Sequence, residues 1–426
     1  MDRISRLPDD VLFHILSFLP TKHAVATSIL SSRWVNLWSF LSIIDLDDSL
    51  YLDPSRRQHS DPALFINFLH RVLSLNQSKT IVKFRLHMHH TYPQTLPGFN
   101  AFIQSVIFRD VVEFDLGVFS NFPLDEDCLM IPNSRSLKVL KVRSEFCLKM
   151  PAFPGCFPSL RVFDVKVSLV EGDELIANLF PCLPALEKLC LAGDLTDCTG
   201  EIYVNIGGAA LKHLDLELLI YNYDECDAMV VIDAPQLDYL RLQDGFLASY
   251  LVKNKPAIGE VRLDVGEYEE EFLEYLDEVG PTRLARFDEL LNSLVNARFI
   301  SVSATTIKVI FSQNWNLPVL PYLIKLELDV HAGSWILLLH WLKSCPNLKV
   351  LSLIIKEKPV FVFEDLESRG VDAVPSCLSS CVKEIEIKRL GKVDEEEMLK
   401  YLLENAKVLD KFTVNSRVYI KDGVLQ

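Results

Sequence analysis

Short segments with apolar residues at their first, fourth and sixth positions recur along most of the chain. IVKFRL from Ile81, LKVLKV from Leu137 and LKHLDL from Leu211 are examples. Further segments of this form begin at Val111, Leu160, Leu186, Leu237, Ile258, Ala297, Leu323, Leu348 and Val382. The alternation at the end of each segment predicts a β-strand with one buried face, because successive side chains of a strand point to opposite sides. The recurrence predicts stacked repeats, since each unit leaves its flanks uncovered and must pack on its neighbours.

The residues before the first repeat follow a helical period instead. Apolar side chains in Leu7–Trp38 recur at spacings of three and four, and Pro8 and Pro20 fit the two ends of the first of three short predicted helices. A unit this small cannot bury so many large apolar side chains by itself. We expect either the following domain or a partner to cover them, since contiguous apolar patches usually mark contacts.

Other segments complete the predicted order of elements. Ile43–Leu46 predicts a short strand, and a helix is expected to start at Pro62. An acidic segment near 266–280 interrupts the repeat and predicts a solvated amphipathic helix, with a docking site for a basic partner as the alternative. Residues 356–373 predict a loop. The stretch Val374–Val414 predicts strand, turn, helix and strand, which we expect to close the end of the repeat array.

The composition disfavours some classes of partner. Acidic residues outnumber basic ones by 58 to 43, and the net charge of −15 makes the chain a poor general binder of nucleic acid or of an anionic membrane surface. The N-terminus shows no signal-peptide core, and the apolar stretches are far shorter than the ~20 residues of a membrane span. We therefore expect a cytoplasmic or nuclear protein whose cysteines are mostly buried, reduced thiols.

No arrangement of residues in the sequence predicts an enzyme. Gly207 and Gly208 lack the lysine and hydroxyl residues that follow the glycines of a phosphate-binding loop. Neither a His-Glu-x-x-His motif nor a nucleophile elbow occurs. We therefore expect no catalytic residue, no cofactor and no metal site.

Two clusters contain residue types that often bind metals. His87, His89 and His90 are interpreted as the polar end of a strand, because carboxylate or cysteine co-ligands are not evident nearby in the sequence. Cys377 and Cys381 are interpreted as buried thiols, because no second cysteine pair follows them. A metal site is the alternative in both cases.

Recognition of a partner is expected from the residues that alternate with the buried positions of the repeat strands. Such side chains share one open face of the predicted sheet, and repeat arrays bind partners on extended faces of this kind. The target-binding candidates are Lys83, Arg85, Lys141, Arg143, Tyr239, Arg241 and Arg262. For each of them, ordinary solvated surface is the alternative interpretation.

The segment Leu7–Trp38 resembles an F-box. The family pattern runs Leu-Pro, then Leu-x-x-Ile-Leu-x-x-Leu-Pro, then Ser-x-Leu-Ser-x-Arg-Trp and finally Leu-Trp. It is matched here by Leu7-Pro8, Leu12, Ile15-Leu16, Leu19-Pro20, Ser28, Leu30-Ser31, Arg33-Trp34 and Leu37-Trp38. Ser32 departs from the pattern, since plant members often carry Lys there, but the apolar positions are intact.

The repeats resemble the leucine-rich repeats of plant F-box proteins, and the C-terminal stretch resembles their FBD module at Pro375–Leu378 and Leu402–Ala406. The resemblance implies an α/β fold. A three-helix F-box would precede a curved leucine-rich-repeat solenoid with a parallel concave sheet, and a strand-helix-strand FBD module would cap the solenoid. The expected domains are residues 1–45, 46–373 and 374–426.

The resemblance also implies a non-catalytic substrate receptor of an SCF-type (Skp–cullin–F-box) ubiquitin ligase. The F-box would dock on a Skp-family adaptor, which links it to cullin and a RING subunit, while the repeats would hold an unknown target protein. Apolar anchors are expected to carry the docking energy. They are Leu7, Pro8, Leu12, Ile15, Leu16, Leu19, Pro20, Val25, Leu30, Trp34, Leu37 and Trp38. Ile15 and Trp34 are also candidates for holding the helices together.

Two other functions remain open from the sequence. The repeats could form an interaction scaffold outside any ligase, with the F-box surface serving as a lid on the first repeat. Alternatively, a small ligand could bind in the solenoid, which requires a pocket lined by converging basic groups. Lys83, Arg85, Lys141 and Arg143 are the candidates for such a pocket.

Overall fold

The computed structural model forms two compact units, residues 1–198 and 199–426. The described residues are 4–51, 62–90, 98–119, 128–144, 147–151, 153–168, 183–194, 200–219, 226–245, 248–266, 280–312, 317–331, 336–356, 373–390, 396–415, 417–420 and 424–425. The helix predicted near 266–280 and the loop predicted at 356–373 lie almost entirely outside them. No helix among the described residues combines the length and the apolar content that a membrane span requires.

The first unit begins with short helices, as the sequence predicts. They are η1 (Ile4–Arg6), α1 (Asp9–Leu16), α2 (Thr21–Ala26), η2 (Thr27–Ile29) and η3 (Leu37–Phe40). The third predicted helix is shorter than expected, because residues 32–36 form turns and only η3 is helical, as a 3-10 turn. Serine side chains compete with a helix by bonding to the backbone, and the Ser28 hydroxyl donates to the Val35 carbonyl in these turns over 3.2 Å.

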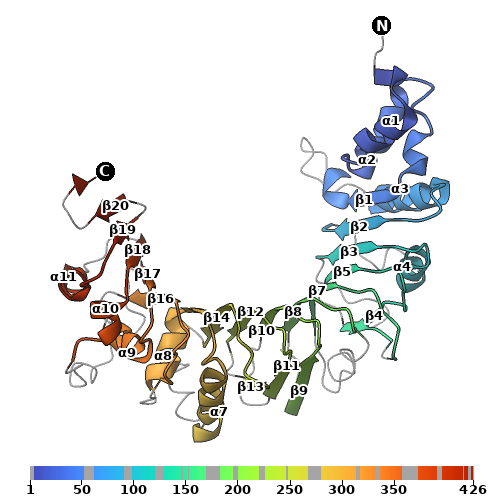
Figure 1. Cartoon of the computed structure of the whole chain (residues 1–426). Helices are drawn as coiled ribbons and strands as arrows, with labels where there is room; N and C mark the ends of the chain where they lie inside the picture. Colours follow the sequence, from blue (N-terminus) through green and yellow to red (C-terminus); the bar gives the residue numbers. More distant parts are fainter. Residues whose placement is uncertain are drawn as a thin grey trace. The chain divides into compact units, whose positions relative to one another are not determined.

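A parallel sheet follows these helices in the first unit (Figure 1). In spatial order its strands are β1 (Ile43–Asp47), β2 (Lys83–Met88), β3 (Glu113–Val118), β5 (Val139–Arg143), β7 (Val162–Ser168) and β8 (Lys188–Asp194). The connections include η4 (Asp48–Tyr51), α3 (Pro62–Leu75), α4 (Phe99–Ile107), and the paired strands β4 (Cys128–Met130) and β6 (Cys147–Lys149). The Phe102 ring of α4 lies 6.4 Å from the Phe84 ring of β2, so α4 covers the buried face of the sheet.

The second unit repeats this arrangement. In spatial order its main strands are β10 (His213–Leu219), β12 (Tyr239–Asp244), β14 (Glu260–Val265), β15 (Phe299–Val302), β16 (Lys325–His331), β17 (Val350–Lys356), β18 (Glu384–Leu390), β19 (Lys411–Val414), β20 (Arg417–Ile420) and β21 (Val424–Leu425). Its helices are α7 (Gly280–Ser293), α8 (Ala304–Ser312), α9 (Ile336–Ser344), α10 (Ser376–Ser380) and α11 (Glu396–Asn405). Pairing is parallel as far as β19, and β20 and β21 add antiparallel strands.

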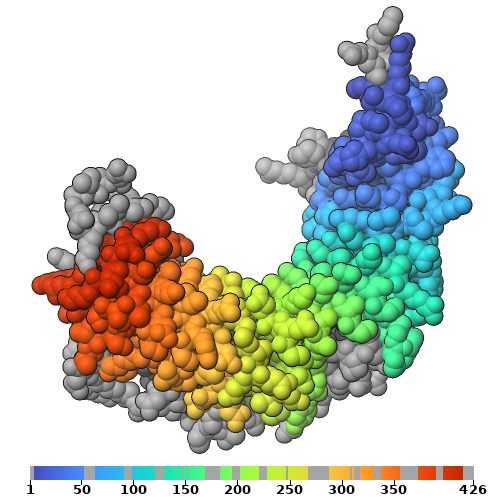
Figure 2. Space-filling model, in the orientation of Figure 1, coloured from blue at the N-terminus to red at the C-terminus, as the bar shows by residue number. Residues whose placement is uncertain are grey.

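The predicted repeat is confirmed in its register. Every predicted segment becomes a strand that begins two residues after its first apolar residue, as Lys83 follows Ile81 and His213 follows Leu211. That first residue is at most 2% exposed in each segment, so it anchors the entry to the strand. Within each unit the colours succeed one another in chain order in Figure 2, as expected when each layer packs on the one before. The predicted α/β fold is therefore confirmed.

A second sheet was not predicted from the sequence. It consists of β9 (Gly200–Gly207), β11 (Cys226–Asp233) and β13 (Ser249–Val252), which pair in parallel within the second unit. These strands belong to the returning segments of successive repeats, and α7 contacts β13. Register partners on β9 and β11 lie 26 residues apart, which is also the offset between β10 and β12, so the stacking of the repeats brings their backbones into register.

Side chains that alternate with the buried ones form a second surface of each main sheet, called the open face below. In β10 the burial alternates between half-buried and buried residues along the whole strand. Leu216 is fully buried, whereas its neighbour Glu217 lies on the open face. This alternation is what a sheet with one packed face requires.

We predict that Leu216→Ala lowers the free energy of unfolding of the second unit by about 2–5 kcal/mol, because it removes packed atoms and leaves a cavity. Glu217→Ala, the matched open-face control, should change it by less than about 0.5 kcal/mol. Urea titration followed by circular dichroism measures both variants. Equal losses in the two variants would contradict the assigned register.

Candidate docking surfaces

The N-terminal helices have a hydrophobic core of their own. Leu12 and Leu16 of α1 pack with Ala24 of α2 and with Trp34, Leu37 and Leu41. Leu7, Phe13, Leu19 and Trp38 pack against this cluster while remaining partly exposed. Four residues predicted to dock on an adaptor, Leu12, Leu16, Trp34 and Leu37, are therefore interior residues of the domain. The sequence could not separate them from surface residues, because both kinds are large and apolar at helical spacing.

The Arg-Trp pair of the F-box pattern holds the N-terminal segment in place. The Trp34 indole Nε1–H donates to the Ser5 hydroxyl over 2.8 Å. The Arg33 guanidinium donates to the Ser5 carbonyl and to the Asp9 carboxylate, the latter over 2.6 Å. Trp34 is only 3% exposed, so its role in holding the helices together, one of its two predicted roles, is the one that the contacts support.

The docking residues that remain at the surface form a smaller set. Pro8, Ile15 and Leu30 are exposed. Leu7, Leu19, Pro20, Val25 and Trp38 are half-buried. Ile15 is 39% exposed and is not part of the buried cluster, so these contacts do not support its alternative role in holding the helices together.

Exposed apolar residues outside the predicted docking set extend this surface. Val11 lies one turn before Ile15 on the exposed side of α1, and Phe18 follows in the turn directly after the helix; both are exposed. Ile29 is 88% exposed, and its neighbour Leu30 is 60% exposed. The sequence feature that could have identified these residues is a large apolar side chain close to a predicted anchor. We call Val11, Ile15, Phe18, Ile29 and Leu30 the apolar surface set.

Polar contacts join the N-terminal helices to the first strand and to η4. The Asp45 backbone N–H donates to the Thr21 hydroxyl over 2.8 Å, and Lys22 donates to the Leu50 carbonyl. The Lys22 ammonium also lies 4.3 Å from the centre of the Tyr51 ring. These contacts fix α2 on β1 and η4 and leave the apolar surface set uncovered by the described part of the chain.

Charges alternate in sign across the open face of the first unit. The backbone register places Asp45 beside Arg85, and Arg85 beside Asp115. It continues with Lys141 between Asp115 and Asp164. The Arg85 Nη1 atom lies 2.7 Å from Asp45 Oδ1. Opposite charges on directly paired residues stabilise neighbouring strands, so this row compensates its own charge.

The predicted basic pocket is not supported by this arrangement. Lys83 lies 3.3 Å from a Glu113 oxygen, and Arg143 lies 3.5 Å from an Asp164 oxygen. With Arg85 paired to Asp45, three of the four candidates for a ligand pocket have an acidic neighbour in contact, and Lys141 has acidic register partners on both sides. A converging positive cluster that could hold an anionic ligand is not formed.

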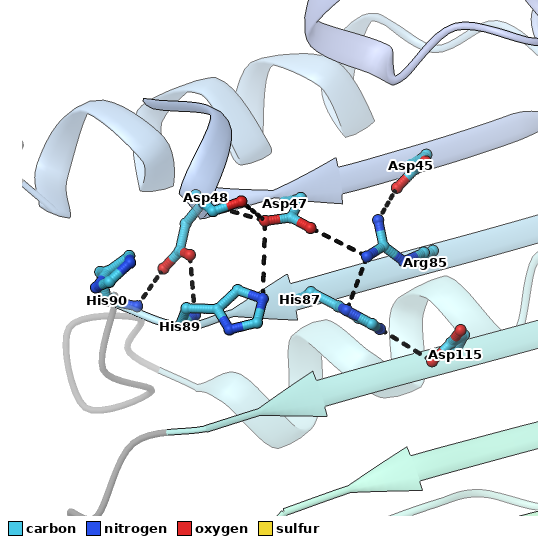
Figure 3. A network of polar contacts seen from close by, with 9 residues as sticks. Asp45, Asp47, Asp48, Arg85, His87, His89, His90 and Asp115 are labelled. Carbon is cyan, nitrogen blue, oxygen red and sulfur yellow. Dashed lines mark hydrogen bonds and ion pairs between the residues drawn. The ribbon is translucent and has the colours of Figure 1, made fainter. Parts of the chain in front are cut away.

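A polar network lies at the carboxyl ends of β1 and β2 (Figure 3). Arg85 Nη2 is 3.0 Å from Asp47 Oδ2 and 2.8 Å from His87 Nδ1. His87 Nε2 is 3.1 Å from Asp115 Oδ1. Burial raises the pKa of Asp47, but hydrogen bonds from Ser49 and Arg85 outweigh burial and lower that pKa below its ordinary value. Carboxylates absent near the histidines in the sequence are thus supplied by neighbouring strands.

The open face of the second unit combines ion pairs with aromatic rings. Arg241 Nη1 is 3.1 Å from Asp215 Oδ1, and the Tyr239 ring stacks on His213 at 4.1 Å. These contacts place two predicted target-binding residues, Tyr239 and Arg241, on adjacent positions of the same face.

Phe299 forms a second aromatic position on this face. The Arg262 guanidinium lies 5.4 Å from the centre of the Phe299 ring, and the Lys325 ammonium lies 4.7 Å from it. Arg262 is also held by Glu260 at 2.6 Å and by Glu327 at 3.5 Å. Aromatic rings flanked by ordered cations offer rigid contact area of the kind that recurs at protein interfaces.

Comparison with known families assigns both ends of the chain. The family described as F-box domain matches residues 4–45, and the family described as FBD matches residues 372–414. This chain carries an F-box domain and an FBD domain. The F-box match covers the N-terminal helices and the apolar surface set, and the FBD match covers α10, β18, α11 and β19. The predicted resemblance to F-box proteins with an FBD module is therefore confirmed.

Relatives along the whole length have the same combination. An F-box/FBD/LRR-repeat protein of Arabidopsis thaliana is 28% identical over 419 residues, which cover 96% of this chain and 89% of that protein. F-box/LRR-repeat protein 13 of the same plant is 29% identical, covering 97% of this chain and 89% of its own length. An FBD-associated F-box protein, also from Arabidopsis thaliana, is 28% identical, and the match covers 97% of this chain and 92% of that protein. The F-box domain and the leucine-rich-repeat relatives indicate a substrate-recognition adaptor.

We predict that Trp34→Ala unfolds the F-box domain locally, because it removes a buried ring and its bond to Ser5, a loss of about 3–5 kcal/mol. Leu30→Ala, which removes an exposed side chain of the same domain, should leave the fold intact. Hydrogen–deuterium exchange of peptides from residues 4–45 measures the difference. Fast exchange in the Leu30 variant, or slow exchange in the Trp34 variant, would contradict the assignment of core and surface.

Proposed function

We propose that this protein is a non-catalytic substrate receptor of an SCF-type ubiquitin ligase. Its F-box domain would dock on a Skp-family adaptor and through it on cullin and a RING subunit, while the repeats would bind the target. The observation that carries this proposal is the apolar surface set on the matched F-box domain, which the described part of the chain leaves uncovered.

The docking surface is narrower in this proposal than the sequence suggests. Burial of an exposed apolar side chain by a partner contributes favourable free energy to binding. Leu12 and Leu16 are already buried in the folded domain, so a partner can bury no further surface on them. We therefore assign docking to the exposed Pro8, Ile15 and Leu30, supported by the half-buried Leu7, Leu19, Pro20, Val25 and Trp38. Val11, Phe18 and Ile29 extend the proposed surface.

The repeats would serve as the target-binding part. Backbone pairing holds the open-face side chains of the second unit at fixed spacing, which reduces the entropy lost on binding. Tyr239, Arg241, Arg262 and Phe299 combine aromatic area with ordered guanidinium groups there. Holding a target on this face would raise the effective concentration of its lysines near the ligase, which is a proximity effect and requires no catalytic group in this chain.

Part of the first unit is less suited to this role. The acidic neighbours of Lys83, Arg85 and Arg143 already satisfy these basic groups. A target would have to replace those ion pairs with contacts of similar strength. We therefore retain Lys83, Arg85, Lys141 and Arg143 as secondary members of the proposed target-binding set. The primary members are those of the second unit.

We predict that Ile15→Ala combined with Leu30→Ala weakens binding to a purified Skp-family adaptor at least about tenfold, because exposed apolar anchors at interfaces each contribute about 1 kcal/mol or more. The matched control is Leu64→Ala, which truncates a 61%-exposed leucine on α3, outside the F-box match. Calorimetric titration measures all variants, and circular dichroism checks their fold. Unchanged affinity in the folded double variant would refute the assigned surface.

Failure of the wild-type chain to bind any Skp-family adaptor would refute the proposal as a whole. The repeats would then act as an interaction scaffold outside a ligase, the alternative that the sequence left open. Co-purification from plant cells treated with a proteasome inhibitor distinguishes the two functions. Cullin and the RING subunit should be recovered with wild type and lost with the double variant.

A further inference from the structure

Three possible metal ligands converge at the carboxyl ends of β1 and β2, where the sequence predicts no metal site. Asp47 and His87 are direct register partners on adjacent strands, and His89 follows β2 immediately. His89 Nε2 lies 3.9 Å from Asp47 Oδ1. One oxygen of Asp47 and one ring nitrogen of each histidine all lie within 4.8 Å of one another (Figure 3).

The surrounding residues fix the orientation of these side chains. The Asp48 carboxylate accepts hydrogen bonds from the backbone N–H groups of His89 and His90, each over 2.8 Å. This carboxylate holds the chain as it leaves β2, so the His89 ring returns toward Asp47. The Phe119 ring stacks on the His89 ring at 4.5 Å and 7°, which fixes the plane of the imidazole.

Gly117 makes room for this packing. A Cβ atom at this position would lie 2.7 Å from the Phe119 ring and 3.1 Å from the His87 ring. Any larger residue would push apart the two rings that support the site. Gly117 is the register partner of His87, which is the register partner of Asp47. This row therefore supplies a carboxylate, an imidazole and the space that Phe119 occupies as it stacks on His89.

The hydrogen bonds of His87 determine which ring nitrogen can bind a metal. An arginine side chain only donates, so the contact from Arg85 Nη2 at 2.8 Å requires an unprotonated Nδ1. Nε2 must then carry the proton and donate to Asp115 Oδ1 over 3.1 Å. Metal-binding histidines typically have this arrangement, in which a carboxylate accepts the proton of the nitrogen that does not bind the metal.

We propose that Asp47, His87 and His89 form a binding site for a divalent transition-metal ion of the Zn²⁺ type. Two imidazole nitrogens and one carboxylate oxygen suit such an ion, whereas Mg²⁺ and Ca²⁺ prefer oxygen ligands throughout. Water would complete the coordination on the exposed side of His89.

Binding requires a small contraction and the displacement of one Arg85 nitrogen, Nη2, from its two contacts. Ligand atoms around a tetrahedral zinc ion lie about 3.3 Å apart, given bonds of roughly 2.0–2.1 Å. The Asp47 and His89 atoms must therefore approach by less than 1 Å, and His89, with a side chain 37% exposed, has room to rotate. The ion would take the place of Arg85 Nη2 beside His87 Nδ1 and Asp47 Oδ2, while Arg85 Nη1 keeps its 2.7 Å pair with Asp45.

The consequence would be a connection between the first two strands of the sheet. Thr21 and Lys22 already attach the F-box helices to β1 and η4. An ion bridging Asp47 to His87 and His89 would fasten β1 to the end of β2 and stabilise the joint between the F-box domain and the repeats. Ligands that bind only the folded state raise its stability, so the melting temperature should increase with zinc concentration.

The test is a zinc titration of the purified full-length chain by competition with a chromophoric chelator, supported by Co²⁺ substitution. We expect one equivalent bound and a visible Co²⁺ spectrum typical of four-coordinate nitrogen and oxygen ligation, without the near-ultraviolet charge-transfer band of thiolate ligands. His87→Gln, His89→Gln and Asp47→Asn should each weaken binding by about 100-fold or more, and Asp115→Asn by about 10–100-fold through loss of positioning.

His90→Gln is the matched control, since His90 adjoins the site but is not a proposed ligand, and its affinity should equal that of wild type. His89→Gln changes a partly exposed side chain, so it tests the proposal even if the His87 variant fails to fold. Wild-type binding no tighter than that of the His89 variant, or a Co²⁺ spectrum with thiolate bands, would overturn the proposal. A purely structural role of the network predicts the first of these results.

Discussion

Parallel pairing of one strand with the next, in a register set by a buried apolar row, is the constraint on which the rest of this structure depends. Leu214, Leu240 and Val261 are register partners across three successive strands and are all fully buried. A shift by one residue would move each of them to the open face, so burial fixes the register wherever the repeat occurs. The backbone hydrogen bonds then follow this register, and each layer can form only against its neighbour.

This register also decides what the open face presents. Register partners on successive strands form rows across the open face. In the first unit, one row consists of Asp45, Arg85, Asp115, Lys141 and Asp164, whose charges alternate in sign. Such a row stabilises the sheet and leaves little uncompensated charge for a ligand. In the second unit, Tyr239 and Phe299 stand in the same row with Glu260 between them, which gives that face apolar contact area as well. The two faces therefore differ in what they offer to a partner, although the same repeat builds both.

The F-box domain meets a different constraint. Its few helices must bury enough apolar surface to stay folded and still leave some exposed. Leu12, Leu16, Trp34 and Leu37 serve the first need, with Ser5 and Arg33 completing the joint around Trp34. Ile15 and Leu30 remain outside, and polar contacts from Thr21 and Lys22 fix the domain on β1 without covering them. The large apolar side chains of the F-box segment are thus divided between an internal core and an exposed surface.

The sequence by itself determined the α/β repeat, the start of each of its strands and the F-box and FBD assignments, because these depend on local periodicity and on motifs within short windows. It did not reveal the small sheet of β9, β11 and β13, whose strands pair only because their repeats stack. It also could not divide the F-box residues into core and surface, since Leu16 and Ile15 are neighbours of similar hydrophobicity. The grouping of Asp47 with His87 and His89 was decided by tertiary structure alone. Those residues lie about forty positions apart in the chain, and only the pairing of β1 with β2 brings the carboxylate beside the imidazoles.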